Sequence, residues 1–276
     1  MIYIVTALHC EAKPLIDHFS LKKNADSQKF DLFQSESIAL IVSGIGKIRS
    51  AVATAFLLTG GNSSDVSAIL NIGICGSFVQ DRKIGELLYI NKITDHAGGR
   101  QYFPEPVLQL GLQEALLETY DKPVENANTV SRDSDLIDME ASGFFQSAAM
   151  FVESHQIYCF KIVSDHLELS NLSKDFISGL IKDRISDIDR IVSQVSLFHT
   201  PEPDLLGKED MELITKIGSN LKLTQSQHHQ LSDLIRSAKV RKKYEAAKMI
   251  PFTTVEIKTK NENKNAFSRI RQILGS

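Results

Sequence analysis

The sequence predicts an α/β protein in which a mixed sheet is flanked by helices and is followed by an appended, mainly helical C-terminal region. Two observations support this prediction. Through about Phe198, short apolar runs typical of buried strands alternate with amphipathic helical patterns, which favours a parallel or mixed sheet with right-handed crossovers. Pro201 and Pro203 then end the pattern, and the chain beyond them is mostly polar and helical.

The individual elements follow from local periodicity. Near-continuous or alternating apolar residues predict strands at 1–7, 29–34, 37–43, 66–72, 86–93 and 157–163. Apolar residues spaced by three or four positions predict helices at 11–19, 47–59, 107–120, 141–154 and 173–197. Beyond the prolines, Thr224 and Gln227 have the spacing of a capping box and predict a helix that runs to Lys239. An alternating pattern predicts a strand at 252–258, and a last helix is expected at 265–274.

These patterns divide the chain into a first domain over 1–198, a linker over 199–206 and a basic, mainly helical extension over 207–276. Charge is unevenly distributed. From Lys239 to Ser276, ten basic residues stand against three acidic ones, so this tail has a net charge of +7 and the remainder of the chain −10. The asymmetry suggests a separate surface for a nucleic acid or protein partner, although the tail carries no recognised nucleic-acid-binding motif.

The overall composition is that of an ordinary soluble protein. The chain has 276 residues, of which 42% are apolar and 24% charged, and its formal net charge is −3. No apolar run approaches the roughly 20 residues that span a bilayer, and the N-terminus lacks the features of a signal peptide. Cys10, Cys75 and Cys159 are widely separated, which indicates neither a disulfide framework nor a zinc site. We therefore expect a cytoplasmic protein with no metal, no cofactor and no membrane partner.

Three acidic residues stand where an apolar run ends. Glu11 and Asp165 follow the first and last expected strands of the first domain. Glu140 lies in the run IDMEASG at 137–143, where a short apolar run turns into a helical pattern. Ligands of open α/β sheets gather at the carboxyl ends of the strands. Three carboxylates at such positions predict a single site.

Glycine-bearing turns also follow strand-like runs. They are Ser-Gly-Ile-Gly-Lys at 43–47, Gly-Ile-Cys-Gly-Ser at 73–77 and the pair Gly98-Gly99. Glycine permits backbone angles closed to other residues and lets a ligand approach the main chain. A tight turn between a strand and a helix uses the same residue, so each turn alone is consistent with either reading.

Taken in order along the chain, five motifs resemble the nucleoside phosphorylase family. They are Glu11 after the first strand, Ser-Gly-Ile-Gly-Lys at 43–47, Asn-x-Gly-x-x-Gly at 71–76, Asp-Met-Glu-Ala at 138–141 and Ser-Asp at 164–165. The resemblance covers about residues 1–198 and is strongest to the methylthioadenosine/S-adenosylhomocysteine nucleosidases. It implies a phosphorylase-like mixed sheet, a homo-oligomer, and hydrolysis of the N-glycosidic bond of a purine nucleoside, with a 5′-modified adenosine as one candidate.

The resemblance also implies roles for individual residues. Glu140 would bind the ribose hydroxyls and stabilise the cationic sugar, with Met139 packed against the ribose. Asp165 would hydrogen-bond the purine and act as general acid toward its N7, and Glu11 would orient or deprotonate the attacking water. Each carboxylate also has a purely structural reading, as an acid in a first helical turn or as a helix cap.

Three further residues complete the implied substrate site. Ile74 and Gly76 belong to the turn that holds the nucleophile in the nucleosidases, where a serine or threonine hydroxyl stands in place of Ile74. Lys161 stands where the nucleosidases often have arginine, which preserves the charge but not the planar fork. The phosphorylases place an arginine near the position of Asn71 to bind phosphate, so the neutral Asn71 favours hydrolysis over phosphorolysis.

Two alternatives stay open at this level. The segment between Gly76 and Asp138 is shorter than usual, and residues 130–133 would be the remnant of the loop over the base. Together with Ile74, the shortened loop leaves open a non-catalytic nucleoside-binding or scaffold protein. The other alternative is a purine nucleoside phosphorylase with an unorthodox anion site near Gly44 or Arg49.

Overall fold

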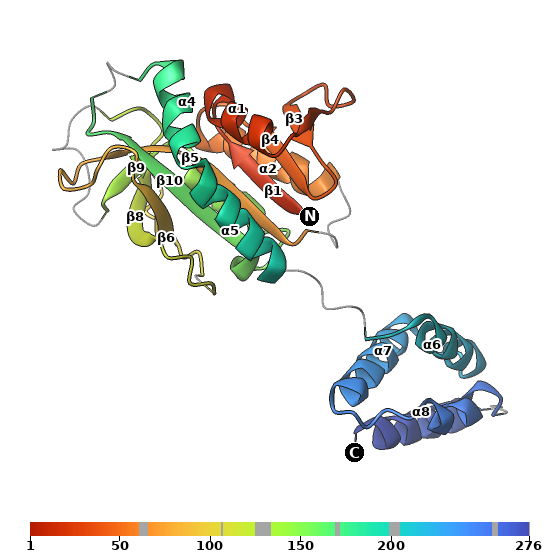
Figure 1. The fold of residues 1–276 in the computed structure, drawn as a ribbon. Helices are drawn as coiled ribbons and strands as arrows, with labels where there is room; N and C mark the ends of the chain where they lie inside the picture. Colours follow the sequence, from red (N-terminus) through yellow and green to blue (C-terminus); the bar gives the residue numbers. More distant parts are fainter. Residues whose placement is uncertain are drawn as a thin grey trace. The chain divides into compact units, whose positions relative to one another are not determined.

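The structure is a computed structural model that describes residues 1–60, 66–105, 107–124, 134–168, 172–198, 205–255 and 259–275. Most of the expected linker, at 199–204, and the expected base-loop remnant at 130–133 lie outside the described residues. The chain separates into two compact units, Met1–Thr200 and Pro201–Ser276 (Figure 1). Each unit has a hydrophobic core of its own.

The predicted fold class is confirmed, and four parallel strands form the centre of the sheet in the first unit. β1 (Ile2–Thr6) pairs with β4 (Ile38–Val42) on one side and with β5 (Ala68–Ser77) on the other. β5 then pairs in parallel with β10 (Ile157–Asp165). β1 and β10 are buried along their whole length, which explains why their sequences are nearly continuous apolar runs. Because these strands are parallel, their carboxyl ends meet at one edge of the sheet.

The remaining strands extend this sheet and close part of it. β6 (Leu87–Asp95) runs antiparallel to β10 and parallel to β8 (Gln113–Thr119), which is parallel to β9 (Leu136–Asp138). β9 pairs antiparallel with the end of β5, so β5, β9, β8, β6 and β10 form a closed ring of paired strands. The ring brings the end of β9 beside the end of β5. Three short strands complete the described sheet: β2 (Lys22–Lys23), β3 (Asp31–Gln34) and β7 (Gln101–Tyr102).

Helices cover both faces of the sheet. α1 (His9–His18), α4 (Lys174–Asp183) and α5 (Ile185–Phe198) pack on one face, and α2 (Lys47–Gly60) and α3 (Ala141–Ala148) pack on the other (Figure 1). In α2, α4 and α5 the buried residues recur every three or four positions, as an amphipathic helix on a sheet requires. A short 3₁₀ turn, Ser154–Gln156, precedes β10. None of the described helices is long and apolar enough to cross a bilayer.

The helix predicted at 107–120 is wrong, because much of this segment is strand β8. The sequence of β8, QEALLET, consists largely of good helix formers. In the folded chain, however, β8 lies between β6 and β9 and pairs with both. Pairing of the backbone on both sides overrides the local preference, which is the usual way in which tertiary context defeats propensity.

Two other helices differ from expectation in extent. α3 is shorter than the predicted 141–154, because the chain turns away after Ala148 toward the 3₁₀ turn. The long helix predicted at 173–197 is divided at Arg184 into α4 and α5. Arg184 binds the chain at this break, since its Nε donates to the carbonyl of Gly85 at 2.6 Å.

The described part of the second unit contains three α-helices: α6 (Lys208–Asn220), α7 (Gln225–Val240) and α8 (Lys260–Gly275). Their core contains Leu231 and Ile235 from α7 and Phe267 and Ile270 from α8, all at most 3% exposed, together with residues of α6. The predicted capping box is confirmed, because the Thr224 hydroxyl accepts from the Gln227 N–H at 3.3 Å and the Gln227 side chain accepts from the Thr224 N–H at 3.0 Å.

The strand predicted at 252–258 is not formed over the part that the structure describes. Two 3₁₀ turns, Ala246–Lys248 and Ile250–Thr253, occupy the region that leads into it. Residues 256–258 lie outside the described residues. Pro251 stands at the start of the second turn, where its missing N–H is not needed.

Candidate active site

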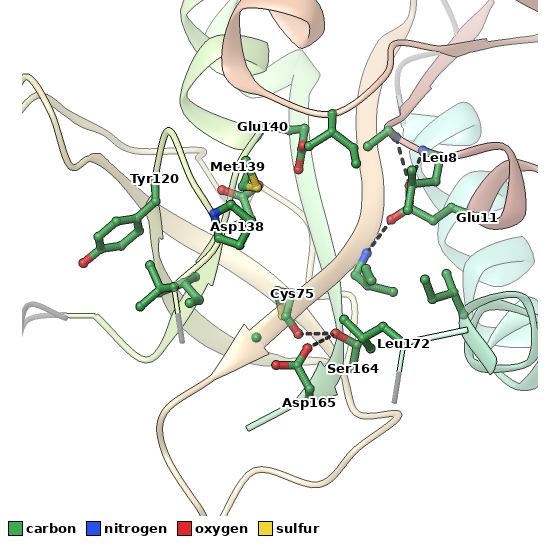
Figure 2. A pocket seen from close by; sticks show the side chains of 18 of the residues that line it. Leu8, Glu11, Cys75, Tyr120, Asp138, Met139, Glu140, Ser164, Asp165 and Leu172 are labelled. Carbon is green, nitrogen blue, oxygen red and sulfur yellow. Dashed lines mark hydrogen bonds between the residues drawn. The ribbon is translucent and has the colours of Figure 1, made fainter. Parts of the chain in front are cut away.

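A cavity of about 290 Å³ opens where the parallel strands end (Figure 2). Its wall is largely apolar and comes from the ends of β1, β5, β9 and β10, from the loop after β8, and from α1 and α4. Of the residues expected to form the site, Glu11, Ile74, Gly76, Met139, Glu140 and Asp165 line it. The three carboxylates therefore meet at one cavity, as their positions in the sequence predicted.

Glu11 lies in the first turn of α1 and is held by backbone N–H groups. Its Oε2 accepts from Ala7 at 2.9 Å and from Leu8 at 2.8 Å, and its Oε1 accepts from Ile74 at 2.9 Å. The side chain is 2% exposed, and this burial raises the pKa of Glu11, while the N–H groups of Ile74 and Leu8 and the charge of Lys161 oppose the rise.

Gly73 allows this carboxylate to lie against the end of β5. A Cβ atom built on Gly73 would lie 2.9 Å from Glu11 Oε1, which is closer than carbon and oxygen approach without a shift. The glycine of the turn at 73–77 is therefore needed for close approach to Glu11.

Glu140 stands at the N-cap position of α3 and points into the cavity. Its Oε1 accepts from the Gly46 N–H at 2.8 Å. Gly46 has φ +105°, a conformation that favours glycine, so the Ser-Gly-Ile-Gly-Lys turn serves here to present a backbone donor. Burial, followed by repulsion from Asp138, raises the pKa of Glu140 to about 7, while Lys161 and the Gly46 N–H act in the opposite direction.

Asp165 is the last residue of β10 and lies at the other end of the cavity in Figure 2. Its Oδ1 accepts from the Leu167 N–H at 2.8 Å. Its Oδ2 lies 2.6 Å from the Ser164 hydroxyl, which is also 3.0 Å from the carbonyl of Cys75. Gly76 is close by, because a Cβ atom there would lie 3.4 Å from Asp165 Oδ1.

Lys161 does not line the cavity, which corrects the expectation that it binds substrate. It lies in the middle of β10 with its side chain 2% exposed, and its Nζ is 2.9 Å from Asp138 Oδ2. Burial disfavours its charged form, but the Asp138 carboxylate acts in the opposite direction and the pKa of Lys161 is raised. The lysine is therefore a buried cation behind the carboxylates rather than part of the cavity wall.

Asp138 is the residue of this site that sequence reasoning missed. Besides Lys161, its carboxylate accepts from the Ala141 N–H at 2.8 Å and from the Thr119 hydroxyl at 2.7 Å. A signal was present, because an aspartate shortly before a helix start can accept from a free N–H of the first turn.

The position of Asn71 bears on the co-substrate. Asn71 is buried within the sheet, where its Nδ2 donates to the carbonyl of Val5 at 3.1 Å and its Oδ1 lies 3.6 Å from Cys159 Sγ. No arginine occurs among the described residues of the cavity wall. The described residues also contain no group of three or more His, Cys, Asp or Glu that could hold a metal ion.

Comparison with known proteins agrees with this geometry. Residues 2–127 match the sequence profile of the phosphorylase superfamily. Over these residues the chain is therefore similar to the phosphorylase superfamily. A 5′-methylthioadenosine/S-adenosylhomocysteine nucleosidase of Buchnera aphidicola is 24% identical over 220 residues, which span 71% of this chain and 94% of that protein. A nucleosidase of the same description from a Marinomonas species is 30% identical over 64 residues, or 23% of this chain and 26% of that protein.

Solved structures share this fold. A Helicobacter pylori 5′-methylthioadenosine/S-adenosylhomocysteine nucleosidase superposes with a TM-score of 0.60 at 18% identity, over 70% of this chain and 97% of that one. The futalosine hydrolase of the same organism gives a TM-score of 0.59 at 19% identity, over 70% and 97%. An Arabidopsis thaliana 5′-methylthioadenosine nucleosidase gives 0.59 at 18%, over 73% and 96%. The matched shares of this chain correspond to about the length of its first unit.

Proposed function

We propose that this protein is a nucleosidase that hydrolyses the N-glycosidic bond of a purine nucleoside, with 5′-modified adenosines as the first candidates. The observation that carries the proposal is the meeting of Glu11, Glu140 and Asp165 at one cavity. The matched relatives are nucleosidases by description, which supports the same reaction class.

Glu140 is suited to hold the sugar. Its carboxylate lies in the cavity, and the Gly46 N–H fixes one oxygen. Hydrolysis of a glycosidic bond passes through a sugar with oxocarbenium character, which a nearby negative charge stabilises. The pKa of about 7 means that this charge develops around neutral pH. Met139 supplies an apolar surface beside it.

Asp165 is suited to protonate the leaving base. The Ser164 hydroxyl has one hydrogen and two oxygen neighbours, Cys75 O and Asp165 Oδ2. The Ser164 hydroxyl can donate to Asp165 Oδ2, and the Leu167 N–H donates to Oδ1, so both oxygens of this carboxyl group are held in place at the cavity. As the general acid, Asp165 would give a proton to the purine N7 as the bond to the sugar breaks.

Glu11 completes the reaction as the base. Water attacks C1′ and its oxygen forms the new bond to the sugar, while one of its protons passes to Glu11. The bond from C1′ to the purine nitrogen breaks, and Asp165 delivers a proton to N7, so that free base and free sugar result. Burial raises the pKa of Glu11, which makes its carboxylate a stronger base than an exposed one.

The test is release of free adenine from methylthioadenosine, 5′-deoxyadenosine and adenosine by the purified chain, with and without phosphate. Release without phosphate that is lost in Glu11→Gln and Asp165→Asn supports the proposal. Lys13→Gln, an exposed change on the same helix as Glu11, is the control and should keep full activity. Tight nucleoside binding without release would indicate the binding protein that Ile74 suggests, and release only with phosphate would indicate a phosphorylase.

An oligomer and a cytoplasmic location belong to the same proposal. Ile48 and Val52 of α2 are 75% and 54% exposed, and Phe56 continues this apolar face. An exposed apolar face of this kind marks an interaction surface, and we expect it to join two copies of the chain. Val52→Glu should then lower the mass measured by light scattering, whereas an unchanged mass would argue against this face.

The three cysteines are unpaired, which suits the reducing cytoplasm.

A further inference from the structure

We propose that Asp138 is a positioning residue that aims Glu140 into the cavity and, through Lys161, sets the electrostatic environment of that carboxylate. The inference rests on the proposed function, because it assigns a role to the groups behind the sugar-binding carboxylate. It concerns a residue whose own oxygens are bound within the protein.

The first step is that Asp138 is fully occupied by protein donors. Its side chain is 1% exposed. Oδ1 accepts from the Thr119 hydroxyl, and Oδ2 accepts from the Ala141 N–H and from Lys161 Nζ, all within 2.9 Å. Although Asp138 borders the cavity (Figure 2), its carboxylate is thus directed at three protein partners rather than at a ligand.

The second step is that these bonds define where Glu140 points. Asp138 ends β9, and Ala141 begins α3. The bond from the Ala141 N–H to Asp138 therefore closes a short loop that contains only Met139 and Glu140. Thr119 fastens this loop to β8, because its hydroxyl donates to Asp138 and accepts from the Ser142 N–H at 3.0 Å.

The third step is electrostatic. The charged groups that face Glu140 are Asp138 from β9, Lys161 from β10 and Glu11 from α1, and the Gly46 N–H faces it from the turn before α2. Asp138 and Glu11 favour the protonated form of Glu140, and Lys161 favours the charged form. Without Asp138, the positive charge of Lys161 acts on Glu140 with one opposing negative charge fewer. Without Lys161, the carboxylates of Glu11, Asp138 and Glu140 remain together with no balancing cation among these groups. The two changes should therefore move the titration of Glu140 in opposite directions.

The experiment measures kcat/KM against pH for the full chain and three single variants. Asp138→Asn should move the acidic limb of the profile to lower pH, and Lys161→Met should move it to higher pH. Thr119→Val removes the hydroxyl hydrogen bonds that join the loop to β8 without changing any charge. It should therefore misplace Glu140 and lower kcat/KM about tenfold or more, while the pH of the acidic limb stays unchanged. The matched control is Ser147→Ala, which removes a buried hydroxyl bond to Ala51 from the same helix, α3, and should leave both quantities unchanged.

A second measurement keeps the inference separate from the proposed function. The Glu140 carboxyl can be titrated by ¹³C NMR and assigned with Glu140→Gln, without any turnover. If the wild type releases no base, the proposed function fails while this titration still tests the inference. Should either single charge variant fail to fold, the double variant Asp138→Asn/Lys161→Met removes both charges together. The pKa of Glu140 in the double variant should lie between the values expected for the two single variants. Shifts of the same sign, no shift, or equal effects of Thr119→Val and Ser147→Ala would overturn the inference.

Discussion

Glu140 carries a raised pKa in the folded chain, and this has a consequence for stability as well as for binding. Burial and the charge of Asp138 raise the pKa of Glu140 to about 7, whereas the pKa of a glutamate in an unfolded chain is about 4.3. The folded chain thus binds this proton more tightly than the unfolded chain. The stability that Glu140 contributes is fully present below the unfolded pKa and is lost as pH rises through about 7.

We therefore expect Glu140→Gln to stabilise the first unit at pH 8 while it abolishes turnover. The gain should be on the order of 2 kcal/mol, because the variant removes an ionised carboxylate that is buried at a cost. The gain should decrease as the pH is lowered and vanish near about pH 3, since the wild-type carboxyl is protonated there in both states. Urea unfolding of the two proteins at both pH values measures the difference, and a variant less stable than wild type at pH 8 would contradict this account.

Gly73 gives a second prediction at the level of one atom. A methyl group at this position would lie 2.9 Å from Oε1 of Glu11, which accepts from the Ile74 N–H, while Ala7 and Leu8 hold the other carboxylate oxygen in place. Gly73→Ala should therefore displace Glu11 and lower kcat by about tenfold or more. Gly179→Ala is the matched control, because a Cβ there meets nothing within 4 Å and α4 should gain about 0.5–1 kcal/mol. Equal activity of the two variants would argue against a constrained Glu11.

Among the elements, α2 and α3 pack unusually closely at the site. A Cβ atom on Gly143 would lie 2.0 Å from the backbone carbonyl oxygen of Lys47. Lys47 begins α2 directly after Gly46, which donates to Glu140. The glycine of the 137–143 run thus brings the two helix starts together, so that a donor from one meets the carboxylate at the start of the other.

Gly143→Ala should separate these helix starts. We expect a loss of about 1–3 kcal/mol in the free energy of unfolding, since overpacking against backbone forces a shift. We also expect a raised KM, because Gly46 would no longer hold Glu140. Gln146→Ala, an exposed change on the same helix, controls for effects on α3 as a whole. A Gly143→Ala protein with wild-type KM would show that the close contact of α2 and α3 does not serve the site.

Predictability also differs between elements. The strands β1, β4, β5, β6 and β10 are predicted from sequence, because a strand buried on both faces must be apolar throughout. β8 is not, since QEALLET satisfies a helical pattern and only its pairing with β6 and β9 decides otherwise. The start of α3 lies between these cases: the Met-Glu-Ala motif indicates its position, but the ion pair of Asp138 with Lys161, which is distant in sequence, is visible only in the folded chain.

For the whole molecule, the division into two units makes a simple prediction. Every residue of the described cavity wall lies in the first unit, and the second unit has its own core of buried side chains from three helices. A chain that ends at residue 200 should therefore fold and keep the kcat/KM of the full protein within about twofold. Residues 201–276 alone should show a cooperative, helical unfolding transition. A truncated chain that folds but has lost activity would assign the second unit a part in catalysis.

The amino-acid sequence alone reveals the properties that lie in short stretches of chain: the alternation of strands and helices, the acids at the ends of apolar runs, the cap at Thr224 and the five motifs that resemble the nucleoside phosphorylases. The tertiary structure decided the properties that depend on groups distant in sequence. It placed Lys161 behind the cavity, made Asp138 its partner, turned 113–119 into a strand and raised the pKa of Glu140. The reason is physical: periodicity records which face of a segment is buried, whereas hydrogen-bond partners, strand neighbours and local electrostatics are set by whichever residues the fold brings together.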